Sequence, residues 1–169
     1  MYRWIGAAMI IGAAGWMGWS ESAALRRKAA LLRELVASLE RMERELTFRL
    51  TPLPELLSRL GREVSEPLST FYLSCARYAV EPETAFWRSW QKEAEKLSPY
   101  LDRSAAESLC RLGRGLGRYD GEGESRLLKI AAAELREHLS RAEAESARLG
   151  KLYRTLGLTV GAFLILVLI

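Results

Sequence analysis

Cysteine and histidine are scarce in this sequence of 169 residues, which contains two Cys and one His. The two cysteines, Cys75 and Cys110, are far apart and form no CxxC pair. A zinc cluster built from Cys and His alone and a disulfide framework larger than one bridge are therefore excluded. His138 is the single candidate for imidazole catalysis, so the composition does not favour an enzyme.

A phosphate-binding loop is also missing. Residues 112–117 read Leu-Gly-Arg-Gly-Leu-Gly, but no strand pattern precedes them, no Gly-Lys-Ser/Thr follows, and the GxGxxG order is absent. We therefore expect no nucleotide, no metal and no other cofactor. Glycines at the end of a helix have no Cβ, so they permit close packing against a neighbour and a left-handed stop.

Charge is absent from two segments, residues 4–19 and residues 155–169. All the Asp and Glu, and all but three of the 25 Lys and Arg, lie between residues 21 and 150. The formal net charge of +4 therefore comes mainly from basic residues beside the apolar segments. Nucleic-acid binding usually shows a basic face on the folded domain itself, so we expect no nucleic acid as a partner.

The two apolar segments predict membrane helices, with membrane lipid as a partner. Their lengths approach a bilayer span once flanking residues are added, and Trp lies near the ends of the first. Lys and Arg gather on the inner flank of both segments, which places the middle of the chain in the cytoplasm. We expect an N-terminal transmembrane segment over residues 1–20, a cytoplasmic domain over 21–150 and a C-terminal transmembrane segment over 151–169.

The end segments leave two alternatives open. The first also has features of a cleaved signal peptide, with Ser20 and Ser22 at possible cleavage positions. Small residues recur at four-residue steps in both, which allows close packing of membrane helices but is also ordinary composition for such helices. The glycines expected to pack are Gly12, Gly18, Gly157 and Gly161.

Helical periodicity dominates the middle of the chain, and no stretch alternates with the period of two that a strand needs. Apolar residues spaced by three and four, interrupted by Pro and Gly, predict helices that begin near residues 20, 53, 68, 82, 103 and 124. The fold class is therefore all-α, a cytoplasmic bundle of about six helices flanked by an N-terminal and a C-terminal transmembrane helix. The last helix continues without Pro into the apolar tail, so it would connect the bundle to the membrane mechanically.

Three side chains are considered as possible catalytic or reactive groups. His138 lies in the apolar row of the last helix near Glu134, and a membrane hydrolase that uses it is the enzymatic alternative. No nucleophile or metal ligand converges on it, so a partly buried, hydrogen-bonded histidine is the preferred interpretation. Cys75 and Cys110 fall on apolar helix faces and are interpreted as small core residues.

Two segments resemble a known family, stage III sporulation protein AB of endospore-forming bacteria. The first is Met42-Glu43-Arg44-Glu45-Leu46, followed by Thr51-Pro52-Leu53-Pro54-Glu55. The second, residues 112–120, is similar to the LGxxLGxSD element of the family, although Tyr119 stands where the family commonly has Ser. The length and the two apolar ends agree with the family as well.

The resemblance implies an interaction protein rather than an enzyme. Its role would be a membrane platform-like component of the mother cell–forespore channel, similar to the platform protein of type II secretion and type IV pilus systems. The implied partners are the ATPase of the same operon, sporulation protein AA, the other SpoIIIA components AC to AH and the forespore protein SpoIIQ. A homo-oligomer is compatible with this role, and a membrane-anchored scaffold or adaptor without energy coupling is the alternative.

The same two segments are expected to form the interaction surface. Turn geometry alone accounts for Pro and Gly at helix ends, so Glu43, Glu45 and Asp120 are the better candidates for partner contacts. Asp120 also has a simpler interpretation as the cap of the last helix. The candidates are Glu43, Glu45, Thr51, Pro52, Leu53, Pro54, Glu55, Gly113, Gly117 and Asp120.

Overall fold

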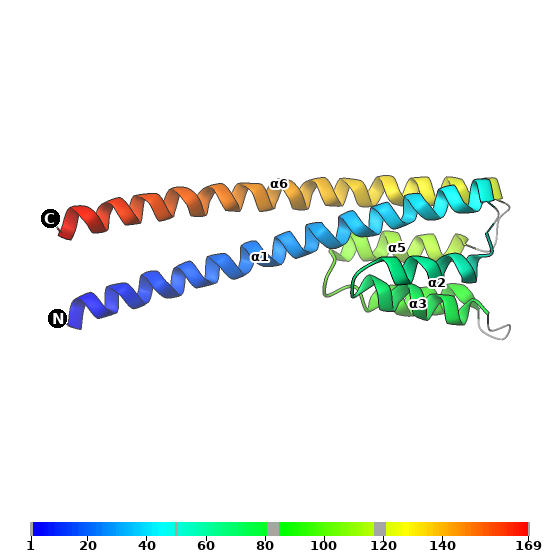
Figure 1. Ribbon diagram of the computed structural model, residues 1–169, viewed down its shortest axis with the longest axis horizontal. Coiled ribbons are helices and arrows are strands. Elements are labelled where there is room, and N and C mark those ends of the chain that lie inside the picture. The colour runs from blue at the N-terminus through cyan, green and yellow to red at the C-terminus, as the bar shows by residue number, and fades with distance from the viewer. Residues whose placement is uncertain (1, 50, 81–84, 117–120, 169) are drawn as a thin grey trace. The chain divides into compact units, whose positions relative to one another are not determined.

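The fold is described from a computed structural model of the whole chain. The structure describes the backbone of residues 2–49, 51–80, 85–116 and 121–168, and the side chains of residues 23–48, 51–80, 85–116 and 123–149. Within these ranges all regular secondary structure is helical, which confirms the predicted all-α class. The elements of Figure 1 are α1 (Tyr2–Arg44), the π-helical turn η1 (Glu45–Arg49), α2 (Leu53–Glu63), α3 (Leu68–Tyr78), α4 (Phe86–Glu95), α5 (Arg103–Gly115) and α6 (Gly121–Leu168).

The helix boundaries follow most of the predicted breaks. No break occurs near residue 20, because α1 runs continuously from Tyr2 to Arg44. Two further differences lie in the bundle. The first is η1, because one π turn at the end of a helix leaves no periodic signal in so short a stretch. The second is α4, which begins at Phe86 and not near residue 82. The residues before it, 81–84, lie outside the described part of the chain.

The chain divides into two compact units. One is Ala30–Leu139, which contains the end of α1, helices α2 to α5 and the beginning of α6. The other consists of Met1–Ala29 together with Ser140–Ile169, the two outer helix ends. The three-part division expected from the sequence stays a prediction.

The predicted membrane segments are helical in backbone, but their side chains lie outside the described residues. The same holds for the four glycines expected to pack there, Gly12, Gly18, Gly157 and Gly161. Among the described residues, no helix has both the length and the apolar character to cross a bilayer.

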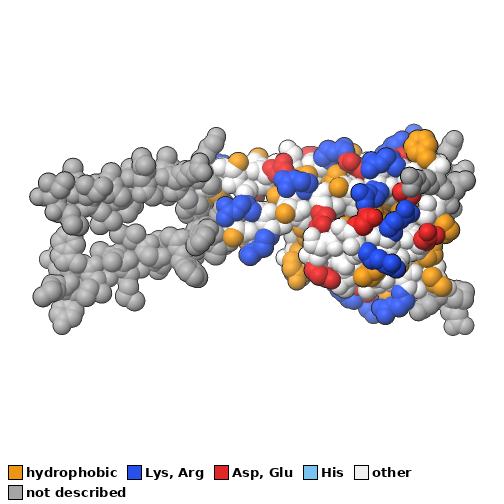
Figure 2. Space-filling model, viewed as in Figure 1, with side chains coloured by type: hydrophobic (Ala, Val, Ile, Leu, Met, Phe, Trp, Pro, Cys, Tyr) orange, Lys and Arg blue, Asp and Glu red, His pale blue; other side chains and the backbone are white. Residues whose placement is uncertain are grey.

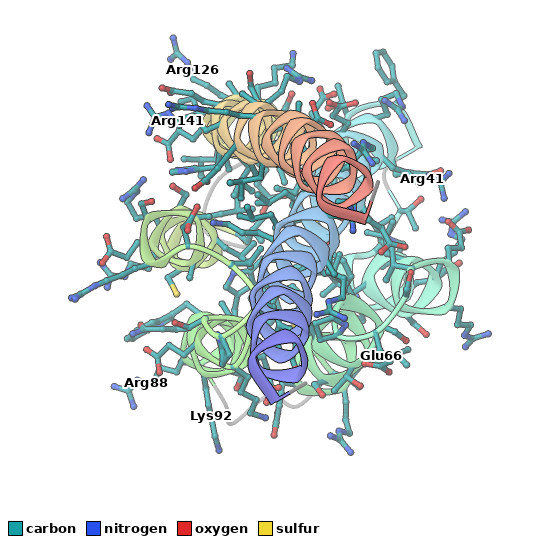
Figure 3. The ribbon with its side chains drawn as sticks, turned by 90° about the vertical axis from the view of Figure 1, so that its left-hand side faces the viewer. Arg41, Glu66, Arg88, Lys92, Arg126 and Arg141 are labelled. Atoms are coloured by element: carbon teal, nitrogen blue, oxygen red, sulfur yellow. The ribbon has the colours of Figure 1, made fainter. Side chains whose placement is uncertain are left out.

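Helix α1 supplies the centre of the unit 30–139. Leu32, Leu35 and Leu39, apolar residues spaced by three and four, are fully buried, and Val36 and Ser38 beside this row are buried as well. Figure 3 shows α2 to α5 placed on several sides of α1. Because neighbours cover more than one face, the buried surface of α1 is wider than the single stripe that the sequence predicts.

An aromatic cluster joins α3, α4 and α5. The ring of Phe71 lies edge-on to those of Tyr72 and Trp90, with centroid distances of 5.0 and 4.8 Å. All three rings are fully buried, which stabilises the fold by roughly 1.5–3 kcal/mol for each side chain. The indole nitrogen Nε1 of Trp90 donates a hydrogen bond to the carbonyl oxygen of Leu109 at 2.8 Å, so α4 is fixed to α5.

Candidate interaction surface

Glu43 lies near the end of α1 and its carboxylate reaches α6. Ser125 Oγ donates a hydrogen bond to Glu43 Oε1 at 2.8 Å, and Lys129 Nζ lies 3.5 Å from the same oxygen. The Ser125 hydrogen bond, helped by the charge of Lys129, lowers the pKa of Glu43 from its ordinary value of 4.5, although partial burial acts in the opposite direction. With only 16% of its side chain exposed, Glu43 is an internal link between α1 and α6.

Glu45 lies in η1 and points to a different neighbour. Its Oε2 accepts hydrogen bonds from Arg59 Nη2 of α2 and from Thr51 Oγ1, both at 3.3 Å. Its side chain is 14% exposed. The structure therefore brings Glu45 and Thr51 together, as part of the connection between η1 and α2.

The proline-rich turn forms the start of α2. Pro52 is the N-cap residue, and its carbonyl oxygen accepts the first helical hydrogen bond from Leu56 at 3.0 Å. Pro54 stands in the first turn, where a missing N–H leaves nothing unpaired. Thr51, Leu53 and Pro54 are half-buried, whereas Glu55 is exposed. Glu55 is thus the acidic candidate that a partner can reach without any movement of the bundle.

The second predicted segment, residues 112–120, is helical as far as Gly115, the end of α5. Gly113 lies inside α5, where a Cβ would lie 2.0 Å from Cδ1 of Trp90. Gly115 lies at the end of α5, where a Cβ would lie 2.2 Å from Cδ1 of Leu127. These contacts confirm the predicted close packing at both positions. Gly117 and Asp120 lie outside the described residues.

Charged side chains of both signs are mixed over the described face in Figure 2. Several of them pair between helices: Arg111 Nη2 lies 2.7 Å from Glu134 Oε2, and Arg136 pairs with Glu40. These four side chains are at least one-third exposed, so each pair contributes at most about 1 kcal/mol. Among the described candidates, Glu43 contacts α6, Glu45 contacts α2 and Glu55 is exposed, so these three do not form one acidic patch.

Two polar links were missed by reasoning from the sequence. Ser38 Oγ donates to the carbonyl oxygen of Leu35 at 2.7 Å and lies 2.5 Å from the hydroxyl of Tyr72, whose pKa is raised by burial. Glu34 accepts hydrogen bonds from the backbone N–H and the Oγ of Ser65, at 2.8 and 3.0 Å. A serine inside the apolar face of a helix is the one signal that would have pointed to the first link.

The three side chains considered for catalysis lie on three different helices, Cys75 on α3, Cys110 on α5 and His138 on α6. His138 is half-buried on α6, and Cys75 is buried with its pKa raised to about 12 by desolvation. The interpretation of Cys75 as a core residue is confirmed, but Cys110 is only half-buried on α5, so that part of the prediction was wrong. Among the described residues, no group of three or more His, Cys, Asp and Glu side chains could hold a metal ion.

Comparisons with known proteins point to one family. The family model described as stage III sporulation protein AB matches residues 3–169. Stage III sporulation protein AB of Bacillus subtilis (strain 168) is 25% identical over an aligned length of 170 residues, and the alignment covers 99% of each chain. A solved structure of stage III sporulation protein AB has a TM-score of 0.65 at 22% identity, and the match covers 72% of this chain and 97% of that one. At this identity the structural likeness supports the fold alone.

Proposed function

Because the chain belongs to the stage III sporulation protein AB family, we propose that it is a membrane platform-like component of the mother cell–forespore channel needed for endospore formation. In this role its apolar ends lie in the mother-cell membrane around the forespore, and its central bundle lies in the cytoplasm. The bundle links a cytoplasmic ATPase, sporulation protein AA of the same operon, to the other SpoIIIA components and to SpoIIQ.

The extent of the family match carries this proposal. It covers residues 3–169, which include both apolar ends as well as the bundle. Helix α6 also supports a coupling role, since it runs from Gly121 to Leu168 and so extends from the bundle sequence into the apolar tail. The sequence has no phosphate loop, so ATP would be hydrolysed by the partner.

A pull-down of the full chain in detergent with sporulation protein AA, with and without ATP, tests the link. Glu55→Arg is the informative variant because Glu55 is exposed. Charge reversal at Glu43 or Glu45 would instead disturb the contacts of α1 with α6 and of η1 with α2. Glu145→Arg, an equal charge change at an exposed position of α6, is the matched control.

We expect nucleotide-sensitive binding that Glu55→Arg weakens and Glu145→Arg does not. Binding that ignores nucleotide would favour the scaffold without energy coupling, and no binding in any state would contradict the ATPase link. ATP hydrolysis by the purified chain alone would contradict the non-enzymatic role. The hydrolase alternative is tested by His138→Gln, which we expect to leave sporulation unchanged.

A further inference from the structure

A groove of about 440 Å³ lies between α4 and α5, and of the described acidic candidates Glu43, Glu45 and Glu55 none lines it. Ala106 of α5, which is buried, and Cys110, which is half-buried, give it a small apolar surface. Gln91 and Glu95 of α4 line the opposite side. The groove therefore combines an apolar strip with polar edges, which suits an extended or helical chain segment.

Basic side chains outnumber acidic ones around this groove. Arg103, Arg111 and Arg114 line it from α5. Arg88 and Lys92 lie four residues apart on α4, so they share a face, and that face adjoins Gln91 and Glu95 of the groove edge. Both are exposed, and Figure 3 shows them pointing away from the bundle.

The charges inside the groove are partly balanced. Arg103 Nε pairs with Glu107 Oε1 at 3.1 Å, and Arg111 pairs with Glu134. Arg114 of the lining, and Arg88 and Lys92 beside it, form no ion pair with another residue in the part of the chain that the structure describes, although the Arg88 guanidinium lies 5.3 Å from the centroid of the Trp87 ring. These three cations are the surplus that a ligand can neutralise.

We propose that this groove binds an acidic segment of a partner protein. Carboxylates of the segment pair with Arg88, Lys92 and Arg114, and a small apolar side chain of the segment lies against Ala106 and Cys110. This site goes beyond the proposed role, since it does not depend on the ATPase.

Two other anionic ligands fit the groove less well. Glu95 and Glu107 stand among its cations, so they repel a uniformly charged phosphate backbone, whereas a peptide can place a neutral or basic residue opposite them. A plane of lipid headgroups contacts the rim but cannot follow a concave surface down to Ala106. An acidic polypeptide satisfies both the charge pattern and the shape.

Direct binding tests the proposal on the full chain in neutral detergent. The probe is a short fluorescein-labelled peptide of alternating Glu and Leu, with a Lys and Leu peptide as the reversed-charge probe. We expect the Arg88→Glu, Lys92→Glu, Arg114→Glu variant to bind the acidic peptide about tenfold more weakly, since three exposed charge pairs of roughly 0.5 kcal/mol are lost. The control is Arg44→Glu, Arg62→Glu, Arg126→Glu, which changes the net charge equally at exposed positions outside the groove.

Cys110 supplies a second readout within the groove. The acidic peptide is expected to slow its modification by N-ethylmaleimide in the parent chain and not in the groove variant. An equal loss of binding in the control variant, or no protection of Cys110, would overturn the proposal. Binding of phosphatidylglycerol vesicles with the same residue dependence, in the absence of peptide binding, would overturn it in favour of a lipid surface.

Discussion

A Cβ at Gly113 would lie 2.0 Å from Cδ1 of Trp90, whose ring is fully buried and hydrogen-bonded to α5. The ring has no room to withdraw, so Gly113→Ala must shift α4 or α5. We expect the free energy of unfolding in mild detergent to fall by about 1–3 kcal/mol, although alanine favours helix over glycine.

Gly61→Ala is the comparison for this prediction. Its Cβ would lie 2.7 Å from Cγ and 3.1 Å from the backbone N of Leu73; the Leu73 side chain is 41% exposed and can rotate outward, so only the milder backbone contact remains. The loss on urea unfolding should therefore be smaller than at Gly113. Equal losses at the two glycines would contradict the assigned role of Trp90.

Glu43 gives the stability of the fold a dependence on pH. Its pKa is lower in the folded chain than the ordinary value of 4.5, chiefly through the Ser125 hydrogen bond. The folded state then binds fewer protons than the unfolded chain, so this contribution is complete above about pH 4.5 and is lost as the pH falls through the lower, folded-state pKa. Glu43→Gln should lower stability at neutral pH by about 1 kcal/mol and flatten its decline in acid.

Ser125→Ala separates this internal role from a partner contact. It removes the main hydrogen bond of Glu43 without changing a charge, so it should lower stability by a similar amount and raise the Glu43 pKa, as followed by unfolding curves at several pH values. If Ser125→Ala had no effect while Glu43→Gln weakened partner binding, Glu43 would belong to an interface.

At the residue scale, the local sequence did not predict which acidic candidates are covered by other parts of the chain. Glu43 and Glu45 stand among arginines. The same local pattern occurs on helix surfaces that face solvent, on surfaces that face a partner and on surfaces covered by another helix. What covers Glu43 is Ser125, 82 residues further along the chain, and no local period reports that neighbour. From the sequence Glu55 was a weaker candidate than Glu43 and Glu45, and its exposure is seen only in the structure.

At the scale of elements, apolar packing outweighs the ion pairs between helices. Leu39 of α1 is fully buried, whereas Glu40 beside it pairs with Arg136 of α6 at the surface. We expect Leu39→Ala to lower the free energy of unfolding by about 2–5 kcal/mol and Glu40→Gln by less than about 1 kcal/mol. Urea unfolding measures both, and a larger loss at Glu40 would show that the surface pairs hold α6 in place.

The helices themselves were largely predictable. The period of three and four located α2, α3 and α5 because each has one apolar face against one set of neighbours. The width of the buried surface on α1 was not predictable, because it depends on how many helices surround it. The turn η1 and the depth of Trp90 beside Gly113 also arise from contacts between elements, which a period along one element does not contain.

At the scale of the whole molecule, the two thiols report two different properties. Modification of Cys75 reports unfolding, and modification of Cys110 reports the side of the membrane on which the bundle lies. Cys75 is buried and desolvation raises its pKa to about 12, so it should react with maleimides only after unfolding. Burial raises the pKa of Cys110 as well, but this thiol is only half-buried, so it should react slowly in the folded chain. If the bundle is cytoplasmic as proposed, N-ethylmaleimide will modify Cys110 in intact cells and a charged, membrane-impermeant maleimide will not. Cys110→Ser is the control, and modification by the impermeant reagent would place the bundle on the other side of the membrane.

The indole of Trp90 has one more consequence. It fills the space above Gly113 and holds α4 against α5 from within, while the groove between the same two helices opens on their outer side. The base of the groove is therefore preorganised before any ligand arrives, and only the long basic side chains on its rim lose rotamer freedom on binding. Substitutions of Trp90 should therefore lower the affinity for a ligand, because the groove would then have to be ordered on binding, even though the indole itself does not contact the ligand.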